Sequence, residues 1–210
     1  VIVQLFRLVS PVIIMLAINP RLTLLSLAPI PIIVIGSRIF RKKIAPFYRQ
    51  AVASHIKYSQ LDIDLTNTIV ICTSVLYDNV FRDKEDIRVW EDVCKQLYSA
   101  GFKLAMKPHP RDTFFASFAD SWHCKLLDAK LSMEEICEYS SPLAIIGHHS
   151  TALVTAKALW NIQSICVTEM FDRNKVDAEF MRVADRYKEV FGQMIQFPKD
   201  LDTLTELINL

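Results

Sequence analysis

Two short polar segments, each directly after an apolar run, contain the residues whose types could do chemistry. The first is Lys107–Asp112 (KPHPRD), and the second is Gly147–Leu153 (GHHSTAL). Each apolar run predicts a buried strand, and an open α/β sheet places its ligand groups at the carboxyl ends of strands. The first segment offers an imidazole and a guanidinium, and the second offers two hydroxyls at a predicted helix start, which suits a phosphate. Together they predict a site for a nucleotide-linked leaving group.

Each of these residues also has a structural interpretation. His109 stands between two prolines that restrict the backbone. An imidazole held in this way suits a general acid that faces a leaving phosphate. The alternative is a loop histidine that is hydrogen-bonded to a carbonyl. Lys107 and Arg111 add positive charge that suits a phosphate, and arginine can bind it through its fork geometry. The alternative is that both are solvated surface charges. Ser150 and Thr151 bind phosphate in one interpretation and cap a helix in the other.

The acidic candidates follow the first predicted strand. Asp78 lies in Leu-Tyr-Asp-Asn, where either a catalytic carboxylate or a turn residue fits. Asp83, Glu85 and Asp86 come next, at the start of a predicted helix. The positive end of that helix explains these three acids without a catalytic role.

Composition excludes several classes of function. The net charge of +1 gives no bulk attraction to nucleic acid. With four glycines and neither GxGxxG nor GxxxxGK[ST], the chain has no glycine-rich phosphate loop. The five cysteines are scattered and never form CxxC, which disfavours a disulfide framework or zinc site and favours a reducing compartment. His148 and His149 have no second ligand cluster beside them, so we expect no metal and no other cofactor.

Strand and helix patterns alternate from about Tyr58 onward. Apolar and β-branched runs predict buried parallel strands, and apolar stripes with caps predict helices between them. The expected strands are 68–73, 102–106, 143–146 and 163–167, and the expected helices are 83–98, a short one from Ser132, 151–160, 176–193 and 201–208. The alternation predicts a Rossmann-like, doubly wound α/β domain with a parallel sheet.

The first forty residues have a different character. Residues 1–18 and 22–35 are nearly free of charge, and Asn19-Pro20-Arg21 separates them. Such a pattern predicts a transmembrane helical hairpin, although a buried hairpin of a larger soluble domain is the alternative. The basic residues Arg38, Arg41, Lys42 and Lys43 follow, which places that end in the cytoplasm.

The same segment resembles the transmembrane domain of ABC exporters. The similarity lies in residues 14–25, Pro29-Ile30-Pro31, residues 38–44 and Tyr48-Arg49, and it covers about residues 1–55. It resembles the end of one spanning helix, a short external turn, and the next helix with its cytoplasmic extension. The Walker and ABC-signature residues of a complete exporter are absent from the rest of the sequence.

Residues from about 60 to 210 resemble bacterial sialyltransferases, in particular the lipooligosaccharide sialyltransferases and capsular polysialyltransferases. The resemblance is carried by the strand-then-acid stretch, by Lys107–Arg111 and by Ser150-Thr151. It implies the C-terminal, nucleotide-binding domain of a GT-B fold and inverting transfer from CMP-sialic acid to a sugar hydroxyl. It also implies that His109 is the acid facing the CMP phosphate, that Ser150 and Thr151 bind this phosphate, and that Asp78 is the base. Tyr77-Asp78-Asn79 matches the acid-acid-Gly motif of these enzymes only in its middle residue.

These observations predict a two-part chain. We expect an ABC-exporter-like transmembrane hairpin at 1–56 and a sialyltransferase-like α/β domain at 57–210, in the inner membrane with the α/β domain in the cytoplasm. The expected partners are CMP-sialic acid, a glycan acceptor of a capsule or lipooligosaccharide, and the membrane through residues 1–45. Association with a second copy is left open. Because the hairpin replaces an acceptor domain, we expect an incomplete enzyme; the alternative function is a fragment of an ABC exporter fused to a non-catalytic α/β module.

Overall fold

The computed structural model describes residues 13, 15, 17–27, 47, 64–74, 80–81, 83–112 and 114–208. The chain divides into two compact units, Val1–Gln50 and Ala51–Leu210. The second unit contains the predicted chemistry.

The second unit is built on a five-stranded parallel sheet with the order β3-β2-β1-β4-β5. The strands are β1 (Thr68–Cys72), β2 (Lys103–Lys107), β3 (Cys124–Leu126), β4 (Ala144–Gly147) and β5 (Gln163–Cys166). The chain moves outward from β1 to β3, and then resumes on the other side of β1 with β4. This reversal makes the gap between β1 and β4 the topological switch point, where doubly wound sheets bind ligands. The predicted α/β class with a parallel sheet is confirmed.

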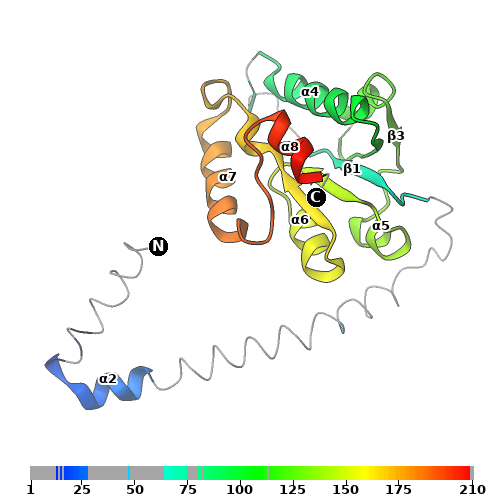
Figure 1. Ribbon diagram of the computed structural model, residues 1–210. Helices are drawn as coiled ribbons and strands as arrows, with labels where there is room; N and C mark the ends of the chain where they lie inside the picture. The colour runs from blue at the N-terminus through cyan, green and yellow to red at the C-terminus, as the bar shows by residue number, and fades with distance from the viewer. Residues whose placement is uncertain are drawn as a thin grey trace. The chain divides into compact units, whose positions relative to one another are not determined.

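Helices cover both faces of this sheet (Figure 1). Helices α4 (Glu85–Ser99) and α8 (Leu201–Ile208) pack on one face, and α5 (Met133–Tyr139) and α6 (Thr151–Thr155) pack on the other. The remaining elements are the short 3-10 helices η1 (Phe115–Phe118), η3 (Val167–Met170) and η4 (Arg173–Lys175), the π-helical turn η2 (Ala156–Trp160) that continues α6, and the helix α7 (Ala178–Phe191).

The strand side chains alternate between two hydrophobic cores. Ile69 and Ile71 of β1 belong to the core under α4 and α8, whereas Val70 and Cys72 belong to the core under α5 and α6. Successive side chains of a strand point to opposite faces of the sheet, and here both faces of the sheet are buried. All five residues of β1 are buried, so the strand is fixed in position and its carboxyl end is held firmly.

Local signals explain where the helices begin and end. Ser132 caps α5 in a reciprocal capping box, because its hydroxyl accepts from the Glu135 amide and the Glu135 carboxylate accepts from the Ser132 amide. Gly101 ends α4 at φ +89°, and the Phe102 amide donates to the Leu97 carbonyl at 3.1 Å. This is the Schellman pattern that a glycine permits.

The first unit contains α2 (Pro20–Leu27). Asn19 caps this helix, accepting from the Leu22 amide at 3.2 Å, and Pro20 occupies its first position, as both residue types prefer. Ile18 and Leu22 are exposed. Within the described ranges, no helix is long and apolar enough to cross a membrane. Much of the predicted hairpin, including residues 1–12 and 28–46, lies outside the described residues.

Candidate functional site

The carboxyl ends of four strands meet at one edge of the sheet. Cys72 pairs in register with Lys107 and with Gly147, which in turn pairs with Cys166. The two polar segments singled out in the sequence therefore start at the same level, one on each side of β1. The structure places both loops at the carboxyl ends of neighbouring strands, as the sequence pattern predicts, with β1 between them.

The loop after β2 is a tight turn built around His109. The Asp112 amide donates to the His109 carbonyl at 2.8 Å, with Pro110 at the second position of the turn, where proline is favoured. The Arg111 amide donates to His109 Nδ1 at 3.2 Å. Because Nδ1 accepts this bond, a neutral imidazole carries its hydrogen on Nε2. The half-buried His109 ring thus keeps one N–H donor for a ligand.

Thr73 and Asp112 join the loop after β1 to the loop after β2. The Thr73 hydroxyl donates to the Asp112 carboxylate, and the His109 amide donates to Thr73 Oγ1 at 3.4 Å. The other carboxylate oxygen of Asp112 accepts from the amides of Phe114 and Phe115 at 2.9 and 3.0 Å. These bonds fix His109 relative to β1.

The two basic residues beside His109 differ in their surroundings. Lys107 is buried, and its ammonium donates to the carbonyls of Pro108 at 2.9 Å and Ala129 at 3.2 Å. Burial lowers the pKa of Lys107. Lys107 is therefore not a solvated surface charge, and these two hydrogen bonds stabilise the loop. Arg111 is exposed, which leaves it available to a charged ligand.

The loop after β4 leads into α6 through Ser150. The Ser150 hydroxyl accepts from the Ala152 amide at 3.2 Å, and Tyr187 of α7 donates to the Ser150 carbonyl at 2.7 Å. Ser150 therefore caps α6, which is one of the two roles that the sequence leaves open for it. Its hydroxyl still has a hydrogen to donate, and Thr151 begins α6 with an exposed side chain. Both side chains remain candidates for a phosphate.

His148 occupies the switch point itself. Its side chain is 2% exposed, and its Nδ1 lies 2.7 Å from the Ser74 hydroxyl, just past the end of β1. Burial, and secondarily the neighbouring His149, lowers the pKa of His148 to about 3. Among the described residues, His148 Nε2, His149 Nδ1 and Trp90 Nε1 are buried without a hydrogen-bond partner. The switch point therefore holds a neutral imidazole with hydrogen-bonding capacity to spare.

The family model of the alpha-2,8-polysialyltransferases (POLYST) matches residues 26–169. This span is more than half of the chain and includes both strand-end loops. The chain belongs to the alpha-2,8-polysialyltransferase family. A search of curated proteins gave no significant match.

Family membership bears directly on the two resemblances drawn from the sequence. The resemblance to polysialyltransferases is confirmed, and the match begins at residue 26, inside the segment assigned to the hairpin. The resemblance of residues 1–55 to ABC exporters is not supported by these comparisons.

The acidic residues that were candidates for the catalytic base in this polysialyltransferase-family chain differ in position and in contacts. Asp78, the predicted base, lies outside the described residues. Glu85 is fully buried and holds Arg88 at 2.6 Å while accepting from the Asp172 amide at 3.0 Å. The Arg88 guanidinium lowers the pKa of Glu85, whereas burial raises the pKa of Asp86. Both acids lie in the first turn of α4, as the helix-start explanation predicts.

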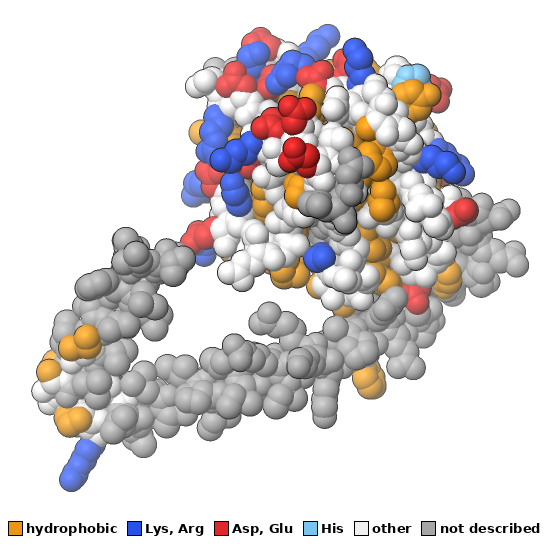
Figure 2. Space-filling model, in the orientation of Figure 1, with side chains coloured by type: hydrophobic (Ala, Val, Ile, Leu, Met, Phe, Trp, Pro, Cys, Tyr) orange, Lys and Arg blue, Asp and Glu red, His pale blue; other side chains and the backbone are white. Residues whose placement is uncertain are grey.

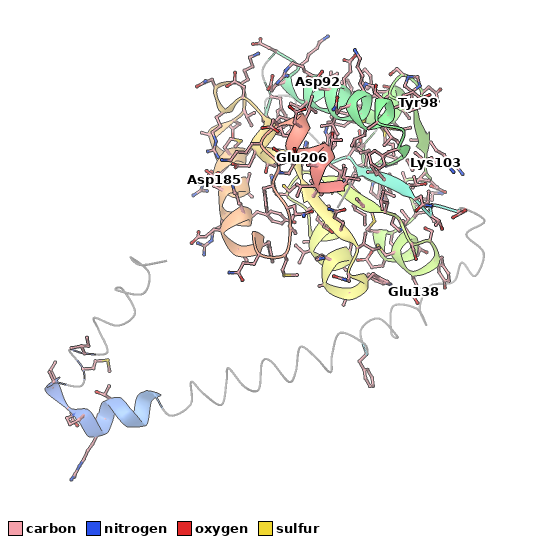
Figure 3. The ribbon with its side chains drawn as sticks, viewed as in Figure 1. Asp92, Tyr98, Lys103, Glu138, Asp185 and Glu206 are labelled. Atoms are coloured by element: carbon pink, nitrogen blue, oxygen red, sulfur yellow. The ribbon has the colours of Figure 1, made fainter. Side chains whose placement is uncertain are left out.

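Other surfaces of the second unit offer less to a nucleotide. A cavity of about 730 Å³ lies at the amino ends of the strands, where Tyr98 and Lys103 sit together (Figure 3); this is the edge opposite the two loops. On the face seen in Figure 2, acidic and basic side chains are interspersed. No group of three or more potential metal ligands occurs among the residues that the structure describes.

The sequence gives no role to three polar residues of this edge. Thr73 and Ser74 contact the predicted loops, and Asp112 lies within one of them; for His148 the sequence suggests only a metal ligand. Thr73 and Ser74 follow β1 immediately, so the rule that ligand groups follow parallel strands would have found them. The partner of His148 depends on the pairing of β1 with β4, which the sequence does not show.

Proposed function

We propose that this edge of the sheet binds CMP-sialic acid and that the enzyme transfers the sialyl group to a sugar hydroxyl with inversion. The observation that carries the proposal is the convergence of the β1, β2 and β4 loops at the switch point. Within the polysialyltransferase family, an N–H donor and two hydroxyls at this point have a natural ligand in the CMP phosphate.

His109 is the residue assigned to the leaving phosphate. Its Nε2–H can donate to a phosphate oxygen as the bond to the sugar breaks and negative charge develops. The second pKa of a phosphate monoester is near 6, so CMP leaves as a stable anion that needs a strong hydrogen bond more than complete protonation. Full proton transfer from an imidazolium would require a hydrogen on Nδ1 and would cost the bond from the Arg111 amide. The geometry therefore favours donation by the neutral ring.

The hydroxyls of Ser150 and Thr151 and the guanidinium of Arg111 are assigned to the same phosphate. They approach from α6 on one side and from the turn after β2 on the other. Asp78 is the proposed base for the acceptor hydroxyl, on the sequence motif alone. The family name points to an acceptor that itself ends in sialic acid. Attachment to the inner membrane through residues 1–45, with the α/β unit in the cytoplasm, is likewise proposed from the sequence alone.

Titration calorimetry of the 210-residue chain with CMP and with UDP tests the proposal. We expect CMP to bind at least tenfold more tightly than UDP. We expect His109→Ala to weaken CMP binding by about tenfold, since a hydrogen bond to a charged group is worth roughly 1.5–3 kcal/mol. Where transfer is measured, the same variant should lower turnover by about 10²–10³-fold, the usual loss when one donor to a developing anion is removed. Ser121→Ala, at an exposed serine outside this edge, is the matched control. Equal affinity for both nucleotides, or no heat with either, would remove the assignment.

A further inference from the structure

Two consecutive hydroxyls after β1 are bonded toward opposite sides of that strand. Thr73 is bonded toward the loop after β2, through Asp112 and the His109 amide. Ser74 is bonded toward the loop after β4, through His148 at 2.7 Å. Thr73 is buried, whereas Ser74 is half-buried. Ser74 is therefore the hydroxyl of this pair that a ligand can reach.

His148 is enclosed by aromatic rings. The ring centroids of Trp90, Phe171 and Phe180 lie 5.1, 5.2 and 5.8 Å from its own, and that of Phe81 lies at 6.0 Å. Apart from its bond to Ser74, the imidazole has no polar partner among the described residues, because Nε2 is buried and unpaired. The indole nitrogen of Trp90 is buried and unpaired as well. This cluster therefore contains one fixed donor, Trp90 Nε1–H, and one ring nitrogen whose role depends on the tautomer.

The tautomer of His148 follows from this inventory. A neutral imidazole carries one hydrogen. If that hydrogen were on Nε2, two N–H donors would be buried together without an acceptor. With the hydrogen on Nδ1, the cluster holds one unpaired donor, Trp90 Nε1–H, and one unpaired acceptor, Nε2, and Nδ1–H donates to Ser74 Oγ. Two buried donors in one apolar cluster are less favourable than a donor and an acceptor whose polarities are opposite, which favours the Nδ1–H form.

The direction of the Ser74 bond then decides what Ser74 offers a ligand. Because its oxygen accepts from His148, its own hydrogen is directed elsewhere, and its side chain is half-buried just past the carboxyl end of β1. We propose that Ser74 donates a hydrogen bond to an anionic oxygen of the bound nucleotide sugar, and that His148 is the buried positioning residue that fixes this direction. This inference rests on the proposed function for the identity of the ligand. CMP-sialic acid has two such groups, the phosphate and the sugar carboxylate.

Calorimetry with CMP and with CMP-sialic acid separates these two sources. We expect Ser74→Ala to raise the Kd about tenfold, while Ser121→Ala leaves it unchanged. An equal loss for both ligands assigns Ser74 to the phosphate, and a loss for CMP-sialic acid alone assigns it to the carboxylate. Unchanged affinity for both ligands overturns the inference while the wild-type preference for CMP still stands.

Variants of His148 test the positioning role. His148→Asn can place an amide N–H where Nδ1–H lies, so we expect it to retain most of the affinity. His148→Leu fills the aromatic cluster without a donor, so we expect it to lose as much affinity as Ser74→Ala. Thermal melting of each variant checks that the domain remains folded.

The tautomer is observable without any ligand. Long-range ¹H–¹⁵N correlation spectra of the histidine rings should show His148 with its hydrogen on Nδ1 in the wild-type chain. A hydrogen on Nε2 would overturn the inference even if CMP binding and the proposed function were demonstrated. Conversely, a chain that shows the Nδ1–H form but does not prefer CMP would refute the ligand assignment and leave the Ser74–His148 geometry in place.

Discussion

The loops on the two sides of β1 differ in how completely they satisfy their polar groups. On the β2 side, Asp112 accepts from a hydroxyl and two amides, and Lys107 donates to two carbonyls. On the β4 side, buried nitrogens of His148 and His149 have no partner among the described residues. In the first loop, the groups that hold His109 in place are paired within the protein. The second loop keeps hydrogen-bonding capacity that the described residues do not use.

This difference has an energetic meaning. A buried polar group without a partner costs about 1–3 kcal/mol, and proteins retain such a cost mainly at functional sites. The β2 loop contributes to folding by holding His109 in place. The unpaired nitrogens of the β4 loop lower stability, as expected if this loop binds the proposed ligand. Substitutions on the two sides should therefore affect stability and binding in opposite proportions.

The largest expected difference concerns acid. His148 has a pKa of about 3 in the folded state because it is buried, but about 6.5 when unfolded. The unfolded state therefore binds a proton that the folded state excludes, so stability is present above pH 6.5 and is lost as the pH falls. We expect the free energy of unfolding to drop by about 2 kcal/mol between pH 7.5 and 5 from this residue, measured by urea titration at each pH.

Two variants identify the source of this loss. His148→Asn removes the titrating group, so the stability of this variant should fall less steeply between pH 7.5 and 5. Because burial also lowers the pKa of His149, the variant should keep a smaller dependence of stability on pH, with the same sign. Phe171→Leu loosens the same aromatic cluster but keeps the histidine, so it should be less stable with an unchanged slope. A steep profile in His148→Asn would show that the acid sensitivity arises elsewhere.

The next effect concerns the β2 side. Asp112→Ala removes the acceptor of the Phe114 and Phe115 amides and of the Thr73 hydroxyl. We expect a loss of about 1.5 kcal/mol in the free energy of unfolding, because two backbone amides and a buried hydroxyl lose their acceptor. Asp112→Asn keeps an acceptor and should lose less. Asp120→Ala, at an exposed aspartate of a neighbouring turn, should change stability by less than about 0.5 kcal/mol. Equal effects at the two positions would mean that the β2 loop is not held by Asp112.

The sequence predicts the framework of this site better than its contacts. The runs at Thr68–Cys72 and Ala144–Gly147 are short, apolar and bounded by polar residues, so their composition alone identifies them as strands. The structure shows both strands fully buried. β3 was missed because it has three residues, of which Lys125 and Leu126 are exposed. No hydrophobic period can be recognised over so short an edge strand. The expected helix at 151–160 exists, but its second half is π-helical, for which residue periodicity gives no signal.

The contacts of the site depend on pairings that are distant in the chain. Ser74 and His148 are 74 residues apart and meet only because β4 lies beside β1. The capping role of Ser150 is local and was predictable, whereas the bond from Tyr187 to its carbonyl crosses from another helix. Local chemistry was therefore accessible from the sequence, and tertiary chemistry was not.

The smallest expected effect tests how firmly the β4 side is held. Tyr187 donates to the Ser150 carbonyl at 2.7 Å, and its ring packs against Phe191 and Phe197. Tyr187→Phe keeps the packing but removes one neutral hydrogen bond, so we expect a loss of about 1 kcal/mol in stability. Because Ser150 is the proposed phosphate contact, CMP binding should weaken by about two- to fivefold through a less ordered α6 start. Tyr139→Phe, at an exposed tyrosine of α5, should change neither quantity. If both variants behave alike in urea titration and calorimetry, the anchor from α7 is dispensable, and the capping bond of Ser150 alone orders this side of the switch point.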